Sequence, residues 1–254
     1  MDIITIPLGE HPELEVYPLA DVHLGDPKTD EEMFKAFAKN ILKEDNRFII
    51  INGDLINNAI KTSVSNPYNE KYSPDEQKDM MTDYLMPLKD RILCMVPGNH
   101  EERSSKETDC HIIKDIAYRI NKKDRYRENG AYINIQFGRD RHGRKLSYAG
   151  YIVHGKGGGK KVGSGLAVLQ DVTLICDADF YVMGHIHHCE GGKLVYLKPN
   201  SIWTKLERFE RALVISRPWQ DYGGYAQRFL YSPQVKGAKP IILSGRTKDM
   251  EIRL

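Results

Sequence analysis

Short apolar stretches along the chain predict a series of strands with helices between them. Residues 14–20 alternate between apolar and polar, which is the period of a half-buried strand. Continuous apolar runs, typical of strands buried on both faces, occupy residues 47–52, 92–96 and 180–183. Apolar residues at helical spacing predict helices over residues 33–42, 80–88, 110–120 and 166–175.

Capping residues indicate where two of these helices begin. Thr29 and Glu32 have the spacing of a capping box, in which a hydroxyl and a later glutamate bind the first free N–H groups. Ser73 gives the same signal for the next helix, with Pro74 at the first helical position and Glu76 at the third. Between the two helices, residues 55–72 are polar and predict a long loop, and loops of this length are often functional.

The second half of the chain is richer in strand patterns. Residues 131–137 and 146–153 alternate around a polar turn and predict a hairpin. Further strands are predicted around residues 193–197, 211–216, 228–231 and 241–243. No internal repeat or linker divides the chain, so we expect a single domain over residues 1–254 with a β-rich C-terminal extension from about residue 200.

Each of five predicted strands leads into a segment that could bind a metal. The segments are Asp21-Val22-His23, Gly53-Asp54, Gly98-Asn99-His100-Glu101, His154-Gly155 and Gly184-His185-Ile186-His187. Singly, each is more typical of a turn or a sheet rim. Because ligands of layered α/β folds collect at the carboxyl ends of strands, together they predict one shared site. If the strands remain extended there, His185 and His187 face one point, and so do Asp21 and His23.

The side chains of these segments suit divalent metals. The candidate ligands are Asp21, His23, Asp54, Asn99, His154, His185 and His187. Carboxylate, imidazole and amide oxygen together fit manganese, iron or zinc better than calcium. Seven ligands are too many for one tetrahedral zinc, so we expect two divalent metal ions, with manganese favoured over iron, zinc, cobalt or nickel. Such a pair can hold a bridging water as hydroxide and activate it for attack on phosphorus.

Composition and charge indicate the partners and the cellular compartment to expect for the protein. A formal net charge of +2 gives no global attraction to nucleic acid or to an anionic membrane. No run approaches the ~18 apolar residues that a spanning helix needs. The four cysteines have no CxxC spacing and fit a reducing compartment. We therefore expect a soluble, cytoplasmic protein without a membrane partner, and its oligomeric state stays open.

The five segments resemble, in order and in residue type, the five motifs of the calcineurin-like metallophosphoesterases. They span residues 21–187, about two thirds of the chain. The resemblance implies an α/β (α+β) fold, a four-layer αββα sandwich of two mixed β-sheets flanked by helices. It also implies a bridging Asp54, with one metal bound by Asp21, His23, Asp54 and His187, and a second by Asp54, Asn99, His154 and His185. His100 would lie near the leaving group as a general acid or a charged hydrogen-bond donor, the alternative being a supporting position behind the ligands.

One position departs from the family pattern. The protein serine/threonine phosphatases of this superfamily carry Gly-Asp-x-x-Asp-Arg-Gly at the second motif, and this chain has Asn57 where the second aspartate would pair with the catalytic histidine. A neutral amide raises the pKa of an imidazolium less than a carboxylate does. The departure favours a phosphodiester substrate, in a nucleotide or in nucleic acid, over a phosphoprotein. The alternatives are a phosphomonoesterase acting on a nucleotide or phosphoprotein, and a catalytically inactive metal-binding scaffold, against which the retained His100 argues.

The remaining candidates have two interpretations each. Arg103 and Asn57 could contact the substrate phosphate, although an arginine there is as often a surface residue. His188 is expected to be structural, because it would face away from His187 in a strand. The glycine- and lysine-rich residues 156–165 predict a solvated linker or a phosphate-contacting lid. Aromatic and arginine residues between 203 and 231 could stack on nucleic-acid bases, or could belong to the core and rim of a β-rich region.

Overall fold

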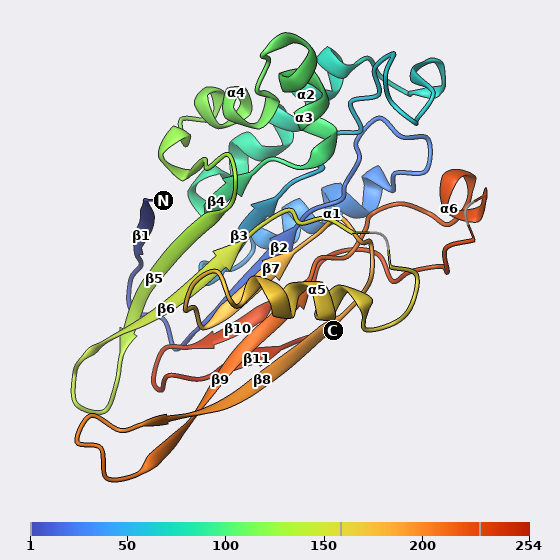
Figure 1. Ribbon diagram of the computed structural model, residues 1–254. Helices are drawn as coiled ribbons and strands as arrows, with labels where there is room; N and C mark the ends of the chain where they lie inside the picture. The colour runs from blue at the N-terminus through green and yellow to red at the C-terminus, as the bar shows by residue number, and fades with distance from the viewer. Residues whose placement is uncertain (1, 158, 229) are drawn as a thin grey trace.

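Two mixed β-sheets pack face to face in the computed structural model of the chain, which describes residues 2–157, 159–228 and 230–254 (Figure 1). The six-stranded sheet contains, in spatial order, β1 (Ile3–Pro7), β5 (Ala131–Arg139), β6 (Lys145–Ile152), β7 (Phe180–Met183), β9 (Leu206–Ile215) and β8 (Gly191–Pro199). The five-stranded sheet contains β11 (Met250–Ile252), β10 (Ile241–Ser244), β2 (Glu13–Leu19), β3 (Arg47–Asn52) and β4 (Ile92–Val96). Strands β2, β3 and β4 are parallel to one another, as are β6, β7 and β9.

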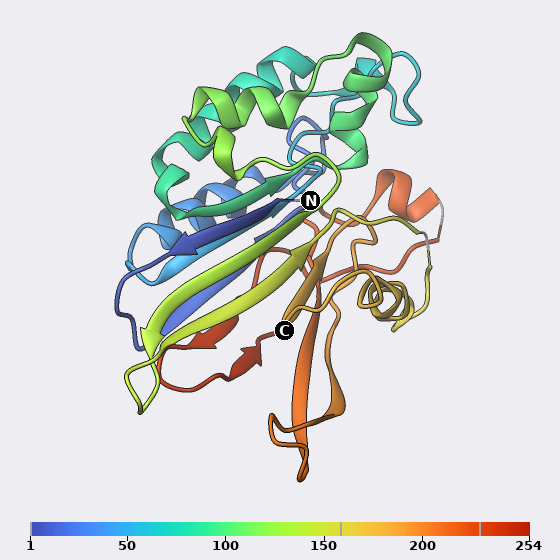
Figure 2. The same cartoon turned by 60° about the vertical axis from the view of Figure 1, so that its left-hand side comes forward.

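Helices cover the outer faces of both sheets, so the expected four-layer sandwich is confirmed (Figures 1 and 2). The five-stranded sheet is covered by α1 (Glu31–Ile41), α2 (Pro74–Leu85) and α4 (Ile112–Arg119), and α3 (Asn99–Thr108) packs beside α4. The six-stranded sheet is covered by α5 (Ser164–Val172). The short helix α6 (Gly224–Arg228) lies between β9 and β10 in the chain. Among the helices that the structure describes, none has the length and apolar character needed to span a bilayer.

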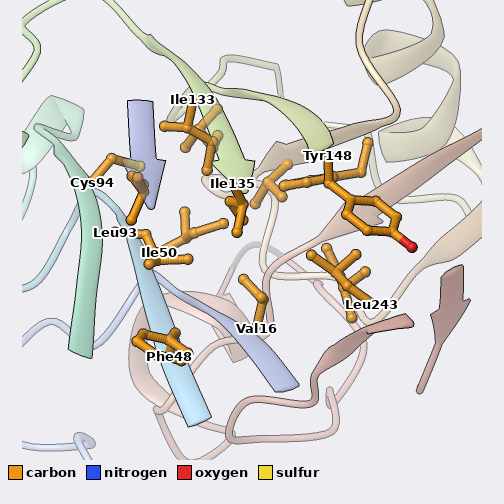
Figure 3. Close-up of a cluster of buried hydrophobic side chains, with 14 of the residues drawn as sticks. Val16, Phe48, Ile50, Leu93, Cys94, Ile133, Ile135, Tyr148 and Leu243 are labelled. Atoms are coloured by element: carbon orange, nitrogen blue, oxygen red, sulfur yellow. The ribbon is translucent and has the colours of Figure 1, made fainter. Parts of the chain in front are cut away.

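The continuous apolar runs are explained by the position of the strands between two hydrophobic layers. In β3, Phe48 and Ile50 enter the core between the sheets, whereas Ile49 and Ile51 pack under the outer helices. Figure 3 shows Phe48 and Ile50 in the inter-sheet core together with Tyr148 of β6. A strand buried on both faces has no polar side to display, so its sequence does not alternate.

Ser73 begins α2 as the sequence predicts, but the predicted capping box at Thr29 is wrong. The N-cap of α1 is Asp30, whose side chain accepts a hydrogen bond from Met33 N at 3.0 Å. The Thr29 hydroxyl instead donates to the carbonyl oxygens of His23 (2.6 Å) and Val22 (3.0 Å). Thr29 therefore holds the loop after β2 rather than the helix that follows.

Other differences from the predicted elements have local causes. Helix α3 was not expected, because Glu101 is its only buried residue and it has no apolar stripe. The short edge strands β1 and β11 were also not expected. The strand predicted around residues 228–231 is wrong: α6 ends at Arg228, and Leu230 has a φ of 59°, which is a left-handed conformation incompatible with a strand. Phe229 lies outside the described residues.

Candidate metal centre

The loops after β2, β3, β4, β6 and β7 bring the candidate ligands together. Three groups of side chains have ligand atoms within 4.8 Å of one another: Asp21, His23 and His187; His23, Asp54 and His100; and Asp54, His154 and His185. Asn99 belongs to the same cluster, since its Oδ1 lies 3.0 Å from His154 Nε2 and 2.7 Å from His185 Nδ1. The structure thus gathers all seven predicted ligands, and His100 lies beside them.

The convergence of these side chains depends on left-handed backbone rather than on an extended strand. The residues concerned have positive φ angles, of 53° at Asp21, 50° at His23, 53° at Asp54, 68° at His185 and 59° at His187. A non-glycine residue in this region costs about 1–3 kcal/mol, and such residues cluster at functional sites. The expectation that residues two apart converge through the strand pleat is therefore corrected: each pair faces one point because both of its members turn.

The first group lies around Asp21. His23 Nε2 and His187 Nε2 are 3.1 Å apart, and His187 Nε2 is 3.4 Å from Asp21 Oδ1. The Asp21 carboxylate also accepts a hydrogen bond from His185 N at 3.1 Å, which joins the loop after β2 to the loop after β7. His23 is 3 % exposed, and its Nδ1 has no hydrogen-bond partner within the described residues.

The second group contains electron-pair donors that face one another. His154 Nδ1 lies 2.8 Å from Asn52 O, a carbonyl that can only accept, so the proton of a neutral ring is on Nδ1. Its Nε2 then presents a lone pair towards Asp54 Oδ2 at 3.2 Å and Asn99 Oδ1 at 3.0 Å. Burial alone would lower the pKa of His154, but Asp54 overcomes burial and raises it to about 10, so near pH 7 the ring is protonated on Nε2 unless a cation takes the place of that proton. Three acceptors around one point need a positive charge between them, so this donor set fits a divalent cation.

Asp54 lies between the two groups and is held by the chain around it. Its Oδ2 is 3.2 Å from His154 Nε2 and 3.8 Å from His23 Nε2. Its Oδ1 accepts from His100 N at 2.9 Å. Gly98 lies so close that a Cβ there would fall 2.1 Å from Asp54 Oδ1, so only glycine fits.

Glu101 supports this arrangement, and the sequence did not single it out as a site residue. Its carboxylate accepts from three main-chain N–H groups, those of Gly98 (2.8 Å), Asp54 (2.9 Å) and Ile56 (3.2 Å). The side chain is 1 % exposed, and burial together with the charge of Asp54 raises the pKa of Glu101 to about 7. The available sequence signal was a glutamate at the third position of α3, where it can cap the helix.

His100 makes its contact with Asn57 through the main chain. His100 Nδ1 lies 2.8 Å from Asn57 O, so Nδ1–H donates and Nε2 carries the lone pair. Arg103 Nη2 donates to that Nε2 at 2.9 Å, and its Nη1 donates to Asn57 O at 3.0 Å. Burial lowers the pKa of His100 to about 4, against the opposing charge of Asp54, so the ring is neutral near pH 7.

The side chain of Asn57 points away from His100. It is 1 % exposed, and its Nδ2 donates to Glu70 Oε1 at 2.7 Å. Gln77 Nε2 donates to the other oxygen of Glu70 at 3.0 Å, so Glu70 joins the loop before α2 to the loop after β3. Asn57 therefore offers its carbonyl oxygen to the site, while its amide is engaged elsewhere.

His188 is connected through Glu190 to the end of the glycine- and lysine-rich residues 156–165. His188 is buried, with Nδ1 at 2.9 Å from Glu190 Oε1. Glu190 also accepts from Gly163 N (2.9 Å) and Leu166 N (3.1 Å) at the start of α5, so the pair connects the last ligand loop to that helix. Part of the expected linker or lid, Gly158, lies outside the described residues.

Three of the aromatic and arginine residues of the C-terminal part lie in different surroundings. Trp219 is 1 % exposed and packs against Phe34 and Phe37, so its ring is closed to a base. Arg211 pairs with Asp177 at 2.7 Å. Trp203 is 81 % exposed and lies in the turn between β8 and β9.

Comparison with known proteins identifies the family of this chain. The family model of the calcineurin-like phosphoesterases matches residues 16–189, which contain every candidate ligand described above. A search of curated protein sequences gives no significant match. Similar solved structures include a single mutant of Vps29 from Entamoeba histolytica (12 % identity, 92 % of this chain and 87 % of that chain, TM-score 0.47) and the calcineurin-like phosphoesterase YfkN from Bacillus subtilis (14 %, 91 % and 90 %, 0.40). A predicted phosphoesterase from Streptococcus pneumoniae is also similar (11 %, 91 % and 84 %, 0.40). Because the family model covers most of the chain and all of the loops that carry the candidate ligands, the protein belongs to the calcineurin-like phosphoesterases, a family of metal-dependent hydrolases that act on phosphoesters.

Proposed function

We propose that the protein is a dinuclear metal-dependent phosphoesterase that cleaves phosphodiester bonds in a nucleotide or a nucleic acid. The observation that carries the proposal is the meeting of two groups of metal-type ligands at Asp54. The carboxylate of Asp54 lies 3.2 Å from His154 and 3.8 Å from His23, so one side chain can serve both groups. Two divalent ions held there would lower the pKa of a bound water and polarise the phosphoryl oxygen.

The chain's own residues orient the substrate and handle its charge. Arg103 is the fixed cation next to His100, and a guanidinium can bind two phosphate oxygens at once. We propose that a bound phosphoryl group takes the Arg103 hydrogen bond that His100 Nε2 receives in the free protein. His100 Nε2 is then free to accept a proton and to donate it towards the leaving oxygen, while Asn57 O keeps the ring oriented through Nδ1.

Two carboxylates beside the site support a diester over a monoester. Asp26 N donates to His23 O at 3.0 Å, which places Asp26 next to the first ligand group, and Glu70 lies behind Asn57. Burial and the charge of Asp26 raise the pKa of Glu70, and the nearby Arg103 opposes that shift. A monoester with two negative charges is repelled by these carboxylates more than a diester with one, because Coulomb energy scales with the product of the charges.

Hydrolysis of bis-p-nitrophenyl phosphate against p-nitrophenyl phosphate tests the proposal, with the protein stripped by a chelator and then supplied with manganese. We expect faster cleavage of the diester, dependent on metal. His100→Asn should lower turnover by about 10²- to 10⁴-fold with unchanged metal content. His142→Asn, which changes an exposed histidine in the β5–β6 turn, is the matched control and should leave turnover unchanged.

The outcomes separate the competing functions. Preference for the monoester would make the protein a phosphomonoesterase, and bound metal without activity on either compound would favour the scaffold. Glu70→Gln sharpens the substrate argument, because loss of one carboxylate should raise monoester cleavage relative to diester cleavage. An unchanged ratio would remove Glu70 from the account of specificity.

A further inference from the structure

β8 is the last strand of the six-stranded sheet, and within the described residues no strand pairs with its outer edge. With β9 it forms a hairpin that extends away from the rest of the molecule (Figures 1 and 2). The strand has nine residues. Natural proteins keep exposed edge strands short, or protect them with charges and prolines, because an open edge pairs with other chains. β8 carries such residues on either side of its middle, Lys193 before it and Lys198 and Pro199 after it, but the apolar Val195 and Leu197 between them leave the middle of the edge open to a partner.

The hydrogen bonds at the two ends of the hairpin show which main-chain groups are free. Ile215 N donates to Glu190 O at 2.9 Å, and Asn200 N donates to Lys205 O at 2.9 Å. The ladder between these bonds has no register shift. Because bonded and non-bonded pairs alternate in an antiparallel ladder, the even-numbered residues of β8 bond to β9. The N–H and C=O groups of Lys193, Val195 and Leu197 therefore face outward.

The same three residues share the face of the sheet that is turned towards the other sheet. Lys193 is opposite Ala212 in the ladder, and Ala212 is part of the inter-sheet core. Val195 and Leu197, further along, are 51 % and 60 % exposed, and Leu206 on the same face is 61 % exposed. This face of the hairpin thus continues the core surface, and no described layer covers it. Its apolar residues alternate across the ladder with charged ones, since Glu210 is opposite Val195 and Arg208 is opposite Leu197, and these two charges pair with each other at 2.8 Å.

We propose that a second copy of this chain covers the edge by antiparallel pairing of β8 with β8, around a twofold axis at Val195. In this register Val195 is opposite its own equivalent and Lys193 is opposite Leu197, so all three outward residues are paired. The pairing joins the two six-stranded sheets into one continuous sheet. An isologous contact of this kind closes as a dimer and leaves no further β8 edge free.

The charges of the strand are compatible with this register. Lys198 is opposite Gly192, and the two copies of Lys193 are separated by four residues along the strand, roughly 14 Å at ~3.4 Å per residue. That separation exceeds the Debye length of about 8 Å in physiological salt, so their repulsion is screened. Each lysine also keeps a carboxylate of its own chain, Lys193 with Glu210 at 2.8 Å and Lys198 with Asp177 at 3.0 Å.

A cavity beside β8 offers space for an apolar side chain of the second copy. It measures about 480 Å³ and is lined by residues 191–193 of β8, by the apolar residues Met250, Ile252 and Leu254, and by the carboxylates Asp249 and Glu251. Residues directly opposite each other in a ladder point to the same face. The second copy's Leu197, opposite Lys193, therefore points to the inter-sheet side next to this cavity, where it loses its exposure to water.

Sedimentation velocity of the full chain over a dilution series tests the proposal. We expect a dimer that dissociates on dilution, and a monomer at every concentration for Val195→Pro. Proline removes the outward N–H at the twofold axis, but that N–H is not used in the β8–β9 ladder, so the hairpin is retained. Val195→Thr keeps the N–H and the strand propensity and should remain dimeric. Unchanged circular dichroism of Val195→Pro excludes misfolding as the cause of dissociation.

Cysteine cross-linking tests the register independently of activity or metal. Cys110 is exposed and Cys176 and Cys189 are half-buried, so all three are first changed to serine. In that background Val195→Cys should form an intermolecular disulfide, since opposed Cα atoms are about 5.5 Å apart. Lys193→Cys should not, because its equivalent is roughly 14 Å away in this register. A monomeric wild type, a dimer that persists in Val195→Pro, or equal cross-linking of both variants would overturn the proposal. If the wild type is monomeric, the open edge of β8 would be available only to a strand of a different protein.

Discussion

The two groups of metal-type ligands are supported differently by the rest of the protein. In the group of Asp54 and His154, His154 Nδ1 donates a hydrogen bond to Asn52 O at 2.8 Å, and Asp54 accepts one from His100 N at 2.9 Å. In the group of Asp21 and His23, the Nδ1 atom of His23, on the side of the ring away from the other candidate ligands, is buried without a partner in the described part of the chain. The side chain of His187 is 33 % exposed. Partners that fix the orientation of a ligand strengthen metal binding and are often worth 10- to 100-fold in affinity.

The difference has a structural origin. Asn52 is the last residue of β3, a strand held by neighbours on both sides, so its carbonyl has a fixed position. His23 lies in the loop after β2 and is positioned by Thr29 and by a hydrogen bond from its own N–H to Asp54 O at 3.0 Å. We therefore expect the position at His154 to bind metal more tightly than the position at His23.

Asp54→Asn should have the largest effect, because it removes the only carboxylate shared by the two groups. We expect metal content to fall at both positions, with the affinity of each reduced by about 100-fold or more, and activity to disappear. Elemental analysis after gel filtration measures this, with Asp83→Asn, at an exposed position in α2, as the control. Loss of one equivalent with retention of the other would contradict the bridging role.

Calorimetric titration of the stripped protein with manganese tests the comparison directly. Two binding steps are expected, separated by about 10-fold or more in affinity. His154→Asn should abolish the tighter step, whereas His23→Asn should leave it and remove the weaker one. The opposite assignment would show that the partners of His154 do not determine the order of filling.

Glu101→Gln should reduce both stability and metal affinity. The amide would place an N–H₂ group against main-chain N–H donors in a buried site, at a cost of about 2 kcal/mol. For a domain of this size that cost corresponds to a fall of about 4–8 °C in melting temperature. Glu102→Gln is the matched control, because Glu102 forms only a surface ion pair with Lys106 and its loss is expected to cost less than about 0.5 kcal/mol. Equal melting temperatures would contradict the supporting role of Glu101.

The gathering of the candidate ligands could be predicted from the sequence because side-chain type and strand position both carry information. Buried strands have recognisable apolar runs, and the first polar residues after them are confined to one end of the sheet. The partners of the ligands could not be predicted in the same way. Asn52 and Asn57 act through carbonyl oxygens, which every residue possesses, so no residue type marks them.

Backbone conformation was also harder to predict from the sequence than the residue types of the candidate ligands. Asp21 and His185 adopt left-handed backbone although neither is glycine, because the surrounding loops impose it. Helix α3 buries one glutamate and no apolar stripe, so hydrophobic periodicity could not reveal it. The β8–β9 hairpin has an ordinary alternating sequence, and only the spatial order of the strands shows that nothing described covers its exposed Val195 and Leu197.

Thr29→Val should give the smallest effect and sharpen the comparison. The Thr29 hydroxyl is the side-chain group that holds the carbonyls of Val22 and His23, and valine keeps the shape of the side chain while removing both contacts. A net loss of about 1 kcal/mol is expected, or about 5-fold in the affinity of the weaker metal step. The tighter step should be unchanged, because none of its ligands lies in that loop. Thr29→Ser retains the hydroxyl and should bind both metals as the wild type does. A loss confined to the weaker step in valine, and absent in serine, would show that the His23 position depends on its loop, whereas equal weakening of both steps would mean that the two positions are one rigid unit.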